Sequence, residues 1–169
     1  MDSRLTLEKR IEAEIKSYDG KMGIYLDDFH GNVIAIHADE AFETASSIKT
    51  YILACLFDEV EKGNKSLEDI IEYKVEHAVD GSGVLAALEP GAKLRVKDAA
   101  TFMIIVSDNI ATNMMIDYLG LEKINQCIKA LGCRIRCCTI PYTLSSMTDL
   151  GPVHREIMPV FLSGWQRGN

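Results

Sequence analysis

Hydrophobic and polar positions follow a helical period near the N-terminus of the chain. Leu7, Ile11 and Ile15 lie four residues apart, with charged residues between them. This spacing is typical of an amphipathic helix, which we expect over residues 4–18. The Asp-Gly pair that follows is a common helix end.

The period then changes from that of a helix to that of a strand. Residues 22–27 and 32–37 alternate apolar and polar side chains or are rich in β-branched ones. Residues 28–31, Asp-Phe-His-Gly, form a turn sequence between them. Two short strands joined in this way predict a β-hairpin.

Apolar helices dominate the chain from there to about residue 133. Residues 49–62 are apolar on most sides, which indicates a buried helix, and residues 97–106 are interpreted in the same way. Two more helices are expected at residues 110–118 and 121–131, each followed by a glycine. The segment between the first two carries Gly-Ser-Gly and Pro-Gly and is expected to be looser.

Composition and charge narrow the class of protein. The chain has 169 residues, enough for one domain with a core, and a net charge of −7. So acidic a surface repels phosphate groups, and we expect neither nucleic acid nor a membrane as a partner. No apolar stretch approaches the roughly 20 residues that span a bilayer. The charged N-terminus has no apolar core of a secretory signal, so we expect a cytoplasmic protein.

An S-x-x-K motif, Ser46-Ser47-Ile48-Lys49, opens the first buried helix. Residues three apart on a helix share a face, so the lysine amine can reach the serine hydroxyl proton. Burial lowers the pKa of a lysine because it disfavours the charged form, and the amine can then act as a base. The competing interpretation is an N-capping serine followed by a surface lysine. The apolar character of the helix argues against it.

A second motif, Ser107-Asp108-Asn109, stands at the break between two predicted helices. Taken alone, it is also compatible with an ordinary helix cap. The two motifs together, in this order, resemble those of the class A β-lactamases and the wider penicillin-recognising serine hydrolases. Gly81-Ser82-Gly83, Pro90-Gly91 and Leu119-Gly120 also follow the order of that family, and the resemblance covers roughly residues 5–133.

The resemblance implies an α+β fold, with helices packed on an antiparallel sheet and a helical subdomain. It implies that Ser46 attacks the carbonyl of a β-lactam or of a related amide or ester, while Lys49 takes the hydroxyl proton. Ser107 would pass a proton to the departing nitrogen, and Asn109 would bind the amide side chain of the substrate. Asp108 would fix the loop. Such acyl transfer requires no metal and no organic cofactor.

Three elements of that family have no counterpart here. The K-T-G motif is absent, no residue can be placed as the Ω-loop glutamate that primes the deacylating water, and most of the central sheet is missing. We therefore expect a truncated and impaired hydrolase. The alternatives are an esterase or peptidase on the same scaffold, and a penicillin-binding sensor or non-catalytic module that stays acylated. The sequence does not indicate an oligomeric state.

Residues 134–169 differ in character from the predicted domain at residues 1–133. They show no sustained period and hold three of the four prolines. Read in another frame, their codons permit an amphipathic helix, so we hypothesise a frameshift near Arg134, which the gene sequence would test. A zinc site made of cysteines and a histidine from this region is rejected because its spacing matches no common ligand pattern (Cys133, Cys137, Cys138 and His154). Cys55 and Cys127 are expected in the core.

Overall fold

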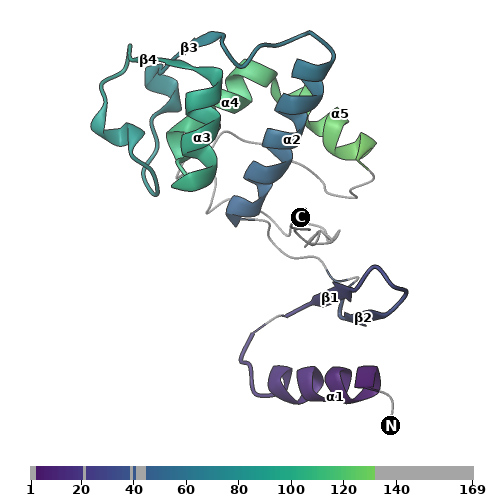
Figure 1. Ribbon diagram of the computed structural model, residues 1–169. Helices are drawn as coiled ribbons and strands as arrows, with labels where there is room; N and C mark the ends of the chain where they lie inside the picture. Colours follow the sequence, from purple (N-terminus) through teal and green to yellow (C-terminus); the bar gives the residue numbers. More distant parts are fainter. Residues whose placement is uncertain (1–2, 21, 39, 41–44, 132–169) are drawn as a thin grey trace, which may run out of the picture. The chain divides into compact units, whose positions relative to one another are not determined.

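The computed structural model describes residues 3–20, 22–38, 40 and 45–131 (Figure 1). The chain divides into two compact units, with a boundary between residues 42 and 43.

The first unit contains the predicted helix and the predicted hairpin. Helix α1 spans Ser3–Ile15, and strands β1 (Ile24–Asp27) and β2 (Val33–Ile36) pair antiparallel. The helix ends three residues earlier than predicted. There the Ser17 backbone N–H and the Ser17 hydroxyl both donate to the Glu14 carbonyl, at 3.2 and 2.8 Å, so a tighter turn replaces the α-helical pattern.

Asp28 organises the turn between the two strands. Its carboxylate accepts hydrogen bonds from the backbone N–H groups of His30 and Asn32, at 2.8 and 3.0 Å, and from the Asn32 side-chain amide at 2.6 Å. These bonds, that of the Asn32 side chain above all, lower the pKa of Asp28 to about 2. Phe29 and Gly31 both have positive φ, as a tight turn requires. The predicted turn sequence therefore does form the turn.

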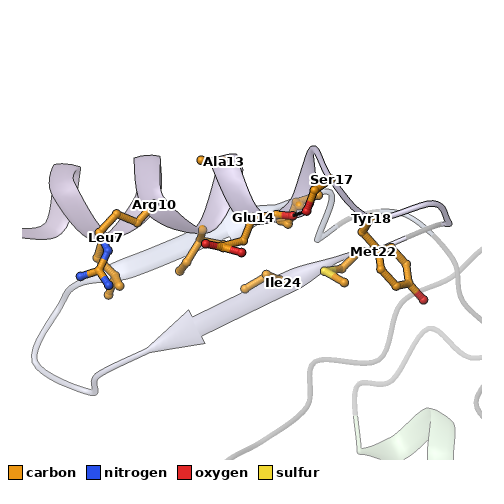
Figure 2. Close-up of a pocket in the computed structure, with 10 residues that line it drawn as sticks. Leu7, Arg10, Ala13, Glu14, Ser17, Tyr18, Met22 and Ile24 are labelled. Atoms are coloured by element: carbon orange, nitrogen blue, oxygen red, sulfur yellow. Dashed lines mark hydrogen bonds between the residues drawn. The ribbon is translucent and has the colours of Figure 1, made fainter.

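A hollow lies between α1 and β1 (Figure 2). The apolar positions of the helix, Leu7, Ile11 and Ile15, line it together with Met22 and Ile24. The predicted apolar face of the helix is thus the one turned toward the hairpin. None of the predicted active-site residues lines this hollow.

The second unit is mainly helical. Its elements, in chain order, are η1 (Ala45–Ser47), α2 (Ile48–Glu61), β3 (Ile70–Glu72), η2 (Val75–His77), η3 (Leu85–Ala87), β4 (Lys93–Arg95), α3 (Val96–Ile105), α4 (Asn109–Leu119) and α5 (Leu121–Ala130). The four predicted helices are confirmed, each within one residue at both ends. Strands β3 and β4 were not predicted. They pair antiparallel, with Ile70 opposite Arg95, and three residues are too few to show an alternating pattern.

The core of this unit lies among the four helices. Each helix contributes fully buried apolar side chains, among them Ile52, Leu56, Val96, Met103, Met114, Met115, Ile124 and Ile128. Cys55 and Cys127 also belong to the core, as predicted. The prediction that α2 and α3 are buried nearly all round is wrong in part. Phe57 is 51% exposed and Ile105 is 68% exposed, because each helix keeps one face toward solvent.

A buried carboxylate joins the loop before α3 to the start of α4. Asp108 is 1% exposed, and one of its oxygens accepts the backbone N–H groups of Val84 and Leu85 at 2.6 and 2.8 Å. The other oxygen accepts the Ala111 N–H at 2.9 Å and caps the helix. A Cβ on Gly83, whose φ is +133°, would lie 2.3 Å from the Asp108 carboxyl group, so only glycine fits there.

Several predictions about the chain ends stay predictions. The atypical tail at residues 134–169, the hypothesised frameshift and the cysteine cluster lie outside the described residues. That residues 1–133 form one domain is likewise not tested. Across the described ranges, no helix is both long enough and apolar enough to cross a bilayer.

Leu56→Ala tests the core. Removing this fully buried side chain leaves a cavity among the helices and should lower the free energy of unfolding by about 2–5 kcal/mol. Phe57→Ala, on the half-exposed neighbour, should cost about 1 kcal/mol or less. Urea denaturation followed by circular dichroism measures both. Equal losses in the two variants would contradict this placement of α2.

Asp108→Ala tests the buried carboxylate. Three backbone N–H groups lose their acceptor, so the free energy of unfolding should fall by at least about 3 kcal/mol. Asp98→Ala in α3 is the control, since that carboxylate is 38% exposed and pairs with Arg95 at the surface. Its loss should cost about 1 kcal/mol or less. A loss at Asp108 no larger than at Asp98 would refute the joining role of Asp108.

Candidate active site

The S-x-x-K motif lies at the start of α2. Ser46 is in η1 and exposed, and Lys49 is in the first turn of α2 and only 2% exposed. The Lys49 Nζ lies 3.4 Å from the Ser46 Oγ, as the spacing predicted. The competing interpretation is therefore wrong, because the lysine is buried. In addition, the residue before α2 is Ser47, whose side chain makes no cap hydrogen bond.

The second motif brings another hydroxyl to the same place. The Ser107 Oγ lies 2.9 Å from the Lys49 Nζ and donates to the Ser46 Oγ at 3.0 Å. The two serines are 61 residues apart in the chain. The motifs that the sequence singled out separately thus form one cluster. The Ser107 hydroxyl stands between the exposed serine and the buried amine.

Lys49 is the centre of this cluster. Besides the two hydroxyls, its amine donates to the Ser107 carbonyl at 2.6 Å and to the Asn109 Oδ1 at 2.8 Å. Burial lowers the pKa of Lys49 below its ordinary value of 10.5, and the nearby charge of Asp108 acts in the opposite direction. The direction agrees with the expectation for a lysine that serves as a base.

Asn109 is held by backbone groups that the sequence analysis did not identify. Its side-chain Nδ2 donates to the Asp80 carbonyl at 3.3 Å, and its backbone N–H donates to the Ser82 carbonyl at 2.9 Å. Backbone acceptors leave no mark in residue type, so no motif could have indicated them. The neighbouring Gly-Ser-Gly sequence predicts a looser segment and follows the order of the family, but neither property identifies these two carbonyls as acceptors.

Backbone strain accompanies the cluster. Among the described residues, four non-glycine residues have positive φ, and two of these adjoin the site: Ala45 at 42° and Ser107 at 54°. Such conformations cost about 1–3 kcal/mol each and persist only where the surroundings hold them. Here one precedes Ser46, and the other aims both the carbonyl and the hydroxyl of Ser107 at Lys49.

The arrangement offers an exposed hydroxyl, a buried amine with a lowered pKa and a second hydroxyl that touches both. Such a set can remove a proton from the first hydroxyl and deliver one to a leaving group. In the part of the chain that the structure describes, no group of three or more His, Cys, Asp or Glu side chains is placed to hold a metal ion.

Comparisons with solved structures agree with the predicted fold. The structure is similar to PBP-A, solved in one case as an acyl-enzyme complex of a mutant with penicillin G, with a TM-score of 0.77 and 27% identity. That match covers 82% of this chain and 53% of the other. A β-lactamase from Sphaerobacter thermophilus matches with a TM-score of 0.74 and 28% identity, over 83% of this chain and 53% of that one. The α+β fold of the class A β-lactamases is thereby confirmed.

Sequence comparisons point to the same group of proteins. A β-lactamase of Streptomyces albus G is 29% identical over 76% of this chain, and one of Proteus vulgaris is 32% identical over 68%. The chain spans only 43% and 38% of the length of these two relatives. The model of the Beta-lactamase enzyme family matches residues 6–154. The chain therefore belongs to the Beta-lactamase enzyme family.

Proposed function

We propose that this chain carries the acylating residues of a serine hydrolase of the class A β-lactamase type, with Ser46 as the nucleophile. The observation that supports the proposal best is the position of the Lys49 amine. It is buried, its pKa is lowered, and it lies within 3.4 Å of the Ser46 and Ser107 hydroxyls. A neutral amine in that place can accept the proton that a serine must lose in order to attack.

The first step is the attack of the Ser46 Oγ on the carbonyl carbon of a β-lactam or of a related amide or ester. A bond forms between that oxygen and the carbon, and the hydroxyl proton passes to the Lys49 Nζ. The carbonyl oxygen gains negative charge, and the Ser46 backbone N–H is proposed as one of its donors. A substrate can reach Ser46 because the residue is exposed.

The second step breaks the bond between the carbonyl carbon and the leaving group. Ser107 is proposed to give its hydroxyl proton to the departing nitrogen and to regain one from the Lys49 ammonium, which lies 2.9 Å away. The product is an ester of Ser46, and Lys49 is neutral again. Asn109 is proposed to bind the amide side chain of the substrate while its Oδ1 holds the amine.

The fate of the acyl ester distinguishes three functions. The solved PBP-A complex is named as an acyl-enzyme with penicillin G, which supports acylation as the shared step. The named relatives are β-lactamases, which supports hydrolysis by the whole protein. A sensor that stays acylated, or an esterase or peptidase on this scaffold, would use the same Ser–Lys pair.

Acylation is tested by intact-protein mass spectrometry after incubation with a penicillin. We expect a mass increase equal to one penicillin molecule, because the Ser46 ester retains all of its atoms. Ser46→Ala should abolish the adduct, and Ser47→Ala, its neighbour, should retain it. An adduct that survives Ser46→Ala would refute the assignment of the nucleophile.

The role of Lys49 is tested by the pH dependence of the acylation rate. Only the neutral amine accepts a proton, so the rate should rise with pH and level off above the pKa of Lys49, which lies below 10.5. Lys49→Arg keeps a positive charge at every pH in this range. It should slow acylation by about 10²- to 10⁴-fold and remove the rise. A rate that does not change with pH would show that Lys49 is not the base.

A further inference from the structure

We propose that Gly81 is a positioning residue for the acylation reaction, because the absence of a side chain there allows Asn109 to hold Lys49. The inference rests on the proposed function. It concerns a residue that touches neither the Lys49 amine nor the reacting hydroxyls. Its effect would pass from Gly81 to Asn109 and from Asn109 to Lys49.

The Asn109 amide has two different ends, and its orientation matters. The Oδ1 accepts from the Lys49 Nζ at 2.8 Å, while the Nδ2 donates to the Asp80 carbonyl at 3.3 Å. If the amide were reversed, an N–H donor would face the lysine donor, and the contact would be lost. The Asp80 carbonyl therefore helps to select the orientation in which Asn109 can bind the lysine.

Gly81 lies directly beside this amide. Its φ is +116°, and a Cβ added to it would lie 2.6 Å from the Asn109 Nδ2. Real side chains do not approach so closely, so one of the two groups must move. The nitrogen is the end of a side chain and not part of the backbone, so the Asn109 amide is the group that would yield. Moving it draws the Oδ1 away from Lys49.

Two other glycines help to distinguish a collision with Asn109 from a disturbed loop or from backbone strain alone. The atoms nearest to a Cβ on Gly83 all belong to Asp108, so a substitution there disturbs the contact between the loop and Asp108. Gly91 has a φ of +99°, close to that of Gly81, but nothing lies within 4 Å of its Cβ position. Gly91→Ala thus reproduces the backbone strain of Gly81→Ala without the collision, and it serves as the matched control.

The test is a double-mutant cycle of Gly81→Ala and Asn109→Ala, read from the rate of acylation by penicillin. Gly81→Ala should slow acylation by about 10- to 100-fold relative to Gly91→Ala. In the Asn109→Ala background the same change should slow it by no more than about twofold, because the colliding group is gone. An equal effect of Gly81→Ala in both backgrounds, or an equal effect of Gly91→Ala, would overturn the proposal.

The stability of the same variants provides a second test. If Gly81→Ala alone does not fold, the double variant Gly81→Ala with Asn109→Ala should fold, since it lacks the Nδ2 atom that collides. Circular dichroism and a denaturation midpoint measure this recovery. A double variant as unstable as Gly81→Ala alone would overturn the proposal.

The pKa of Lys49 provides a third test, which does not depend on acylation. If the unsubstituted chain forms no adduct with penicillin, the proposed function fails, and the cycle is then read from the pKa of Lys49 by NMR titration of its Cε. Asn109→Ala removes an acceptor of the charged amine and should lower this pKa. Gly81→Ala should shift it in the same direction, and the shifts should not add. An unchanged pKa in folded Gly81→Ala protein would overturn the role of Gly81.

Discussion

The site depends on the burial of one amine. A lysine that is 2% exposed has lost most of its contact with water and must find acceptors within the protein. The Ser107 and Asn109 side chains and the Ser107 carbonyl provide them, all within 2.9 Å. These acceptors lie 58 and 60 residues from Lys49 in the chain, so satisfying the amine fixes the loop before α4 against the first turn of α2. The cluster is a consequence of that requirement.

The acceptors would not stay in place without support of their own. Asp108 lies between Ser107 and Asn109 and uses both carboxylate oxygens to bind backbone N–H groups of the preceding loop and of α4. The same loop passes so close to Asp108 and Asn109 that glycine stands at the two contact points, Gly83 and Gly81. The loop, the carboxylate and the amide are therefore fitted to one another, and the strained φ of Ser107 is held by this fit.

Long elements and the two motifs could be predicted from the sequence, whereas short elements and backbone contacts could not. Helices α2 to α5 have enough turns for their apolar positions to show a period. Strands β3 and β4 have three residues each and show none. The pairing of Ser46 with Lys49 follows from helical spacing. The hydrogen bond from Asn109 to the Asp80 carbonyl depends instead on how the loop that contains Asp80 folds back onto α4. The exposure of Phe57 and Ile105 shows that burial cannot be predicted from the apolar character of a residue alone.

Stability and reactivity depend on the same packing in this site. In many enzymes a strained or polar active site reduces stability, and substitutions that remove the strain stabilise the protein but reduce its activity. Here burial of the amine lowers the pKa of Lys49, and the same packing of α2 against α3 and α4 belongs to the core. Looser packing would admit water, raise the pKa of Lys49 toward its ordinary value and leave less of the neutral amine. Core substitutions should thus weaken the fold and the base together, even where they touch no member of the cluster.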